Sequence, residues 1–226
     1  MTIAQETKLM RSEIWNTKRH IELQMMQYLI VKLSHDIIGT IGAMQMSHLL
    51  VTDVHSIDHG IACNKLFDDS TRRAVSLISY IQVMFSVNDV IDYDTFYDLS
   101  SKLVRSKTSS IQLSTQDFEL NSVPSAIYQI LMYFVWLIYN ATIKSTSINI
   151  LISSKKGIYD INIIASGYNF EINKSEIDIL LNQSSYAMNS YNIVAFYIKH
   201  MIQDVVQLKI TENSSNIYTF NLICNM

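Results

Sequence analysis

The sequence predicts an α+β fold in which a helical hairpin precedes a domain of mixed helices and strands. Residues 19–51 and 64–86 carry apolar side chains at helical spacing over lengths that suit long helices. After residues 88–92 the pattern changes to shorter segments that alternate between helical and strand periodicity. We therefore divide the 226-residue chain into an N-terminal tail, 1–18, a hairpin, 19–88, and a second domain, 92–226.

The first predicted helix, residues 19–51, sets an apolar stripe against an outward histidine. At about 3.6 residues per turn the stripe occupies one side of the helix, while His35 points to roughly the opposite side. We expect the stripe to form core and His35 to face outward. The stripe consists of Met26, Ile30, Leu33, Ile37, Ile41, Met44 and Val51.

The second predicted helix, residues 64–86, is also amphipathic, and a polar segment at 52–60 separates it from the first. Two long amphipathic helices cannot bury both of their stripes against each other alone. We therefore expect two copies of the hairpin to form a dimeric four-helix bundle. The apolar positions of this helix are Phe67, Ala74, Leu77, Ile78, Ile81 and Phe85.

Turn and cap signals divide the second domain into short elements. Pro124 stands in the first turn of a long apolar helix that Ser122 would cap and that ends near Lys144. A helix with an aspartate cap spans 94–105, and the turn Lys155–Gly157 joins two strands. Further helices are expected at 171–181 and 189–204, and strands at 110–115, 148–153, 159–165, 205–212 and 217–224.

Composition excludes several classes of protein. Hydrophobic residues reach 49% and charged residues 16%, which favours a compact globular protein. A net charge of −3 offers no bulk attraction to nucleic acid. The longest apolar run, residues 130–139, is too short to span a membrane, and residues 1–20 lack the apolar core of a signal peptide. We expect a cytoplasmic protein without a nucleic-acid or membrane partner.

The cysteines and the paired histidines give little indication of a metal site. Cys63 and Cys224 lack metal-site spacing and are expected to be reduced packing residues, as in a cytoplasm. His55 and His59 are four residues apart, a spacing at which two side chains on one face of a helix can bind the same metal ion. Asp58 lies between them and Gly60 follows directly, so we do not favour a metal site at this pair.

The residues around His35 indicate a reactive imidazole. Asp36 follows it, and Gly39 and Gly42 lie on the same outward face one and two turns later. Each glycine inside a helix costs about 1 kcal/mol relative to alanine, so two of them suggest space for an approaching partner. A neutral imidazole is a nucleophile, and an adjacent carboxylate can orient one ring nitrogen while the other attacks. The alternative is a surface histidine beside a solvated aspartate.

The segment Leu33–Ala43, LSHDIIGTIGA, resembles the H-box of the ChpT-type histidine phosphotransferase family. Dimerisation helices of sensor histidine kinases carry a looser version of this pattern. Two positions depart from it: Thr40 stands where the family has a proline, and Gly39 stands where kinases with phosphatase activity often have Thr or Asn. The resemblance implies that His35 is the phosphate carrier.

The second domain resembles the ATP-binding domain of histidine kinases, an antiparallel α/β sandwich, in the order of its helices and strands. Residues 137–144 are similar to the N-box, in which Asn140 matches the asparagine that would hold Mg²⁺. The two glycine motifs that cradle phosphates are replaced by bulkier residues at 165–169 and 189–192. Loss of these motifs is a feature of the ChpT family, so the resemblance implies a degenerate ATPase-like domain that does not use ATP.

The resemblance implies a histidine phosphotransferase that relays a phosphoryl group between receiver-domain aspartates in a bacterial phosphorelay. His35 would carry the group, Asp36 would orient or polarise the imidazole, and Lys32 could lie near the phosphoryl oxygens. The implied partners are a second copy of the chain and the receiver domains of a hybrid histidine kinase and of response regulators. Mg²⁺ would come with the receiver, so the chain would need no cofactor.

Receiver docking is assigned to the surface around His35. The predicted docking residues are Lys32, Ile38, Gly39, Gly42 and Met46. Alternatively, Lys32 is a solvated lysine and the other four pack beneath the second domain. Two other functions stay open: a histidine kinase with a divergent ATP site, and a non-catalytic dimeric scaffold in which His35 is incidental.

Overall fold

A computed structural model describes most of the chain. The backbone is described for residues 3–52, 57–86, 90–105, 107, 109–116, 118–142, 145–168, 170–183, 185–204, 206–214 and 216–225. Side chains in these ranges are described except at residues 3–19, 47, 50–52, 57–60, 62 and 214. The possible metal pair of His55 and His59 therefore lies outside the described side chains.

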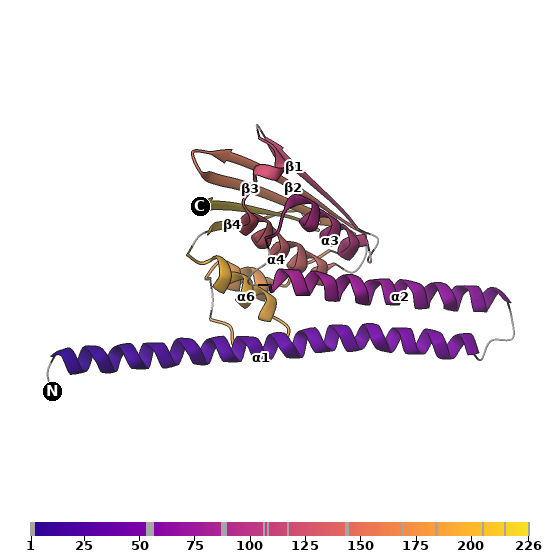
Figure 1. The fold of residues 1–226 in the computed structure, drawn as a ribbon, viewed down its shortest axis with the longest axis horizontal. Coiled ribbons are helices and arrows are strands. Elements are labelled where there is room, and N and C mark those ends of the chain that lie inside the picture. Colours follow the sequence, from indigo (N-terminus) through magenta and orange to yellow (C-terminus); the bar gives the residue numbers. More distant parts are fainter. Residues whose placement is uncertain are drawn as a thin grey trace.

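Two antiparallel helices form the N-terminal hairpin, which lies along one side of the molecule (Figure 1). Helix α1 spans Ile3–Thr52 and α2 spans Ile57–Met84. Both begin earlier than the predicted starts at residues 19 and 64. Residues 3–18 contain no glycine or proline and several strong helix formers, which explains why α1 extends through them.

The second domain is a sandwich in which α4 and α6 lie between the hairpin and one face of a β-sheet (Figure 1). The predicted helices are all present, so the α+β fold class is confirmed. Helix α5 is shorter than the predicted 171–181. Helix α6 begins later than the predicted residue 189, because residues 185–192 form a loop that asparagine side chains stabilise. The helices are α3 Tyr93–Arg105, α4 Ser125–Ala141, α5 Lys174–Leu180 and α6 Ile193–Ile202.

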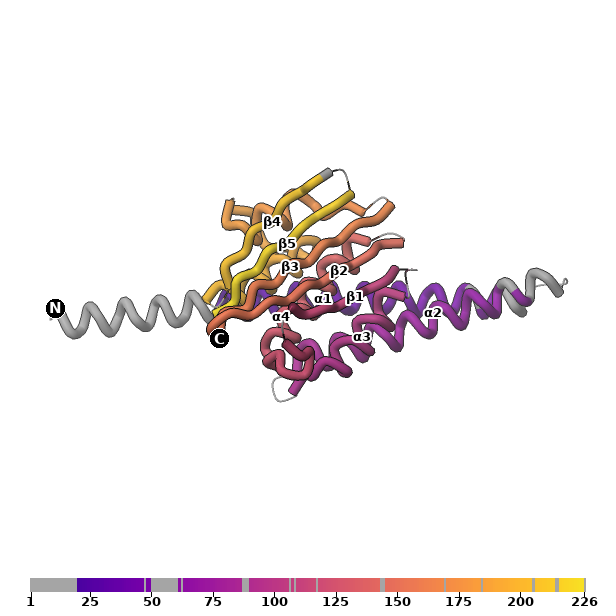
Figure 2. Tube along the Cα trace, turned by 90° about the horizontal axis from the view of Figure 1, so that it is seen from above, coloured from indigo at the N-terminus to yellow at the C-terminus, as the bar shows by residue number. Residues whose placement is uncertain are grey.

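The sheet has the strand order β1-β2-β3-β5-β4 (Figure 2). Strand β1 is parallel to β2, while the other neighbouring pairs are antiparallel. The expectation of an antiparallel sheet is therefore wrong at β1, because α4 forms a crossover connection between β1 and β2. The strands are β1 Ser110–Gln116, β2 Thr146–Lys155, β3 Ile158–Gly167, β4 Val206–Ser214 and β5 Ile217–Asn225.

One of the two predicted helix caps is confirmed. The backbone N–H of Thr95 donates to Asp92 Oδ1 at 2.8 Å, so Asp92 caps α3. The cap predicted for α4 is wrong: Ser122 Oγ donates to the carbonyl of Glu119 at 2.7 Å, within the 3₁₀ turn Leu120–Ser122. Pro124 is the N-cap residue of α4 instead. Its ring fixes φ, so the helix can begin without a side-chain cap.

Helix α4 forms the centre of the core that joins the hairpin to the second domain. Its side chains are buried on nearly all sides, as is typical of a helix that is apolar all round. Tyr80 Oη of α2 donates to the carbonyl of Met132 at 2.7 Å, and the Phe85 ring packs edge-on against Trp136 with centroids 5.9 Å apart. The two parts of the chain therefore share one core.

The buried face of α1 lies beside the predicted stripe. Met25 and Leu29 are buried in the shared core, whereas Met26, Ile30 and Ile41 of the predicted stripe are exposed. The prediction that these three residues belong to the hydrophobic core is therefore wrong for a single copy of the chain. The reason is that α6 contacts α1 and the second domain covers the side of Met25 and Leu29, which leaves the neighbouring apolar side open.

Candidate functional site

His35 lies within α1 with its imidazole in solvent. Its side chain is 85% exposed, which confirms the outward orientation predicted from helix periodicity. Helix α1 continues without a break past Thr40, the residue at the position of the family's proline. The hydroxyl of Thr40 donates to the carbonyl of Asp36 at 2.7 Å, one turn back along the helix. His35 is therefore accessible to a large partner and is carried by a regular helix.

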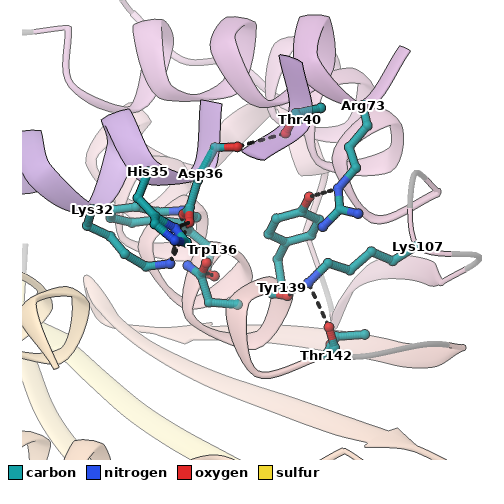
Figure 3. A network of polar contacts seen from close by, with 10 residues as sticks. Lys32, His35, Asp36, Thr40, Arg73, Lys107, Trp136, Tyr139 and Thr142 are labelled. Carbon is teal, nitrogen blue, oxygen red and sulfur yellow. Dashed lines mark hydrogen bonds and ion pairs between the residues drawn. The ribbon is translucent and has the colours of Figure 1, made fainter. Parts of the chain in front are cut away.

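Asp36 contacts both a lysine and the histidine (Figure 3). Lys32 Nζ donates to Asp36 Oδ1 at 2.9 Å and to Oδ2 at 2.8 Å. The same Oδ1 lies 3.4 Å from His35 Nδ1, near the limit of a hydrogen bond. The carboxylate can therefore accept from Nδ1 when that nitrogen is protonated, and Nε2 then carries the free lone pair.

Lys32 is much less exposed than His35. Its side chain is 22% exposed and that of Asp36 is 20% exposed, against 85% for His35. Lys32 lies between the outward face of His35 and the buried side of α1 at Leu29, so its role in docking stays a prediction. In this arrangement its ammonium group is engaged by Asp36.

The exposed surface around His35 is apolar and unobstructed. Ile38 is 67% exposed and Met46 is 59% exposed, so neither is covered by the second domain. A Cβ atom built at Gly39 or at Gly42 would have no other atom within 4 Å, apart from the helix's own nearby backbone. The two glycines therefore do not serve close packing within the described part of the chain.

A second polar cluster lies across from Asp36, where α2 meets the end of α4 (Figure 3). Arg73 Nε donates to Tyr139 Oη at 3.2 Å. Lys107 Nζ donates to the carbonyls of Tyr139 and Thr142, both at 2.6 Å, and lies 4.1 Å from the Tyr139 ring centroid. These contacts join residues far apart in the sequence, so periodicity could not indicate them. Burial lowers the pKa of Lys107 to about 8, with a further contribution from the charge of Arg73.

Glu176 is a buried carboxylate in the first turn of α5, and sequence reasoning missed it. It is 6% exposed. Burial raises its pKa to about 7, while hydrogen bonds from Asn173 and the positive charge of Lys32 oppose this shift. Lys32 therefore interacts electrostatically with the second domain as well as with Asp36. An acidic residue in the first turn of a short helix carries no signal of burial, which explains why it was missed.

In the loop 189–192, which replaces one glycine motif, asparagine side chains accept hydrogen bonds from the backbone amides. Asn189 Oδ1 accepts from the N–H groups of Tyr191 and Asn192 at 2.9 and 3.2 Å, and Asn192 Oδ1 accepts from that of Asn189 at 2.9 Å. At the other replaced motif, a Cβ on Gly167 would come within 2.7 Å of Thr146 Oγ1. This glycine therefore permits close packing of β2 and β3.

The candidate Mg²⁺ ligand Asn140 is partly buried on α4. Its Nδ2 donates to the carbonyl of Trp136 at 2.9 Å. In the part of the chain with described side chains, no three His, Cys, Asp or Glu residues are grouped closely enough to hold a metal ion. Among the described helices, none is both long and apolar enough to cross a membrane.

The arrangement of helices and strands matches that of known signalling proteins. A bacterial phosphotransferase of known structure superposes with a TM-score of 0.72 over 88% of this chain and 96% of that chain, at 14% sequence identity. The chain has the fold of a bacterial phosphotransferase. The resemblance predicted from Leu33–Ala43 and from the order of elements is thus confirmed for the fold.

Histidine kinases share parts of this architecture. The kinase ThkA, in a complex with the response regulator TrrA, superposes with a TM-score of 0.50 over 94% of this chain and 65% of that chain, at 16% identity. The catalytic domain of ThkA alone has a TM-score of 0.43 over 58% of this chain and 89% of that chain, at 18% identity. The sequence matches no protein-family model and no curated protein sequence.

Proposed function

We propose that the protein is a histidine phosphotransferase that relays a phosphoryl group between receiver-domain aspartates through His35. The observation that carries this proposal is an imidazole that is 85% exposed beside a carboxylate, on the helical hairpin of a chain with the fold of a bacterial phosphotransferase. His35 is the nucleophile and carrier, and Asp36 is the carboxylate that orients it.

The transfer step balances with a phosphorylated receiver as the only co-reactant. The Nε2 lone pair of His35 attacks phosphorus in an aspartyl phosphate, the P–O bond to the aspartate breaks, and its electron pair stays on the receiver's carboxylate. The Nδ1 proton remains on the ring, where the Asp36 carboxylate offsets the positive charge. Attack by the aspartate of a second receiver reverses these steps. Mg²⁺ belongs to the receiver in this scheme, and this chain supplies no cofactor.

The receiver docks on the exposed face of α1 in this proposal. Ile38, Gly39, Gly42 and Met46 form the contact surface, because the first and last are exposed apolar side chains and the glycines leave room between them. Receivers of a hybrid histidine kinase and of response regulators are the proposed partners. The ThkA structure contains a kinase of related fold together with a response regulator, which supports a partner of this class.

We also propose that two copies pair through the hairpin into a four-helix bundle. Met26, Ile30 and Ile41 of α1 and Val75 and Ile78 of α2 are apolar and exposed in the single chain. A second copy that covers these side chains would remove them from water. The relay would operate in the cytoplasm, where the receivers of such pathways are found.

The loop geometry favours phosphotransfer over the kinase alternative. Backbone amides cradle phosphates only when they are available to them, and Asn189 and Asn192 already provide acceptors for three of the amides in the loop 189–192. A kinase with a divergent ATP site would need these side chains to move away. A non-catalytic scaffold remains the second alternative, and it predicts no phosphate on His35.

Incubation with a labelled receiver or with labelled ATP distinguishes the phosphotransferase from the kinase and from the non-catalytic scaffold. The chain is incubated with a receiver carrying radiolabelled phosphate and, separately, with labelled Mg-ATP, followed by a test for acid-labile phosphate on it. The proposal predicts labelling from the receiver only, and none in His35→Gln. This variant should fold normally because the His35 side chain is in solvent. Labelling from ATP supports the kinase, and no labelling from several receivers supports the scaffold.

A further inference from the structure

We propose that Lys32 is a positioning residue for phosphoryl transfer at His35 and acts through the carboxylate of Asp36. This inference rests on the proposed function of His35. The ammonium group of Lys32 contacts both carboxylate oxygens, at 2.9 and 2.8 Å, so the carboxylate is held at two points. One of these oxygens is the atom that lies 3.4 Å from His35 Nδ1. Lys32 thereby fixes the acceptor on which the histidine depends.

The residues around the Lys32–Asp36 ion pair stabilise it more than its spacing on the helix does. Acid-to-lysine order along a helix is the favourable one, and Lys32 precedes Asp36, so the intrinsic gain of this pair is small. Both side chains are nevertheless about four-fifths buried, on the α1 side that continues from Leu29. Lys32 also interacts electrostatically with Glu176 of the second domain. The Lys32–Asp36 pair therefore lies where it is largely shielded from water.

The consequence for His35 is a choice of tautomer. A carboxylate can accept only from a protonated ring nitrogen, so a fixed Asp36 favours the form with hydrogen on Nδ1. The Nε2 lone pair is then directed away from Asp36 and toward the approaching receiver. Without Lys32, the Asp36 carboxylate is free to turn into solvent, and the tautomer with hydrogen on Nε2, which cannot attack through that atom, becomes more populated.

The other role considered for Lys32, direct contact with the phosphoryl oxygens, makes a different prediction. In that role Lys32 stabilises the transferring group independently of Asp36. In the positioning role, Lys32 has no effect once the Asp36 carboxylate is removed. A double-mutant cycle distinguishes the two roles, since only residues that act through one another give non-additive effects.

The first test uses ¹⁵N NMR of the imidazole nitrogens in the full chain, with the His35 signals assigned from the spectrum of His35→Gln. Asp36→Asn and Lys32→Met are each expected to lower the fraction with hydrogen on Nδ1 at least twofold. Lys32→Arg, which can make the same two contacts, should retain the wild-type fraction. Lys65→Met, at an exposed lysine of α2, is the control and should change nothing. An unchanged tautomer in Lys32→Met overturns the inference.

The second test measures the rate of transfer from a phosphorylated receiver in wild type, Lys32→Met, Asp36→Asn and the double variant, all checked for native melting. Each single substitution should slow transfer about tenfold, and the double variant should be no slower than Asp36→Asn. Multiplication of the two effects, or a normal rate in Asp36→Asn, overturns the inference. If wild type accepts no phosphate at all, the proposed function fails, while the NMR result still decides the role of Lys32 at His35.

Discussion

Replacement of Glu176 by Gln should stabilise the protein in a strongly pH-dependent way. The pKa of Glu176 is raised from 4.5 to about 7, because its carboxylate is buried beneath the second domain's surface. Below pH 4.5 both the folded and unfolded chains are protonated at this residue. As pH rises from 4.5 through 7, the unfolded chain loses its proton first, so wild type loses stability over this window.

The size of the stability difference follows from the shift in the pKa of Glu176. At about 1.36 kcal/mol per pKa unit, a rise from 4.5 to about 7 corresponds to about 3 kcal/mol of stability lost by pH 8.5. Glutamine has nearly the same shape and no charge, so it does not incur this loss. We expect Glu176→Gln to equal wild type near pH 4.5 and to exceed it by up to about 3 kcal/mol at pH 8.5. For a chain of this length, that is a rise in Tm of about 6–12 °C.

Urea unfolding followed by far-UV circular dichroism at pH 4.5, 6, 7 and 8.5 measures this difference. The contributions of the other titrating groups to the free energy of unfolding cancel in this difference, because the two proteins differ at one residue. Glu171→Gln, at an exposed carboxylate just before α5, is the matched control and should give no pH-dependent difference. The reasoning is refuted if Glu176→Gln differs from wild type equally at pH 4.5 and 8.5, or if it is the less stable protein at pH 8.5.

Three further predictions concern docking, assembly and nucleotide. Gly42→Leu should melt no lower than wild type, because nothing packs where its Cβ would stand and leucine gains about 1 kcal/mol in helix propensity. It should nevertheless accept phosphate from a receiver at least tenfold more slowly; a normal rate would remove Gly42 from the docking surface. Light scattering at micromolar concentration should give the mass of two 26.0 kDa chains, and a monomeric mass would contradict the four-helix bundle. Calorimetry should detect no binding of Mg-ATP, whereas micromolar affinity would favour the kinase.

The confirmed predictions are those that depend on local periodicity. The exposure of His35 followed from its position opposite an apolar stripe, and the order of helices and strands followed from turn signals such as Lys155–Gly157. These features depend on residues within one or two turns of each other. The resemblance of Leu33–Ala43 then indicated the fold that the bacterial phosphotransferase shares with this chain.

The corrected predictions depend on which element packs against which. A helix wheel shows that α1 is apolar over a wide arc, but it does not show that the second domain covers Met25 and leaves Met26 exposed. The burial of Lys32 and Asp36, and the contacts of Arg73 and Lys107 with Tyr139, likewise required the second domain to be placed on the hairpin.

The sequence by itself determined the elements, their order and the outward histidine, because hydrophobic spacing and turn residues act over short stretches of chain. Only the tertiary structure decided how deeply Lys32 and Asp36 beside that histidine are buried, and which charges of the second domain lie near them. Charges interact through space over distances that sequence separation does not encode, so the approach of Glu176 to Lys32, across more than half the chain, appears only once the second domain is placed on the hairpin.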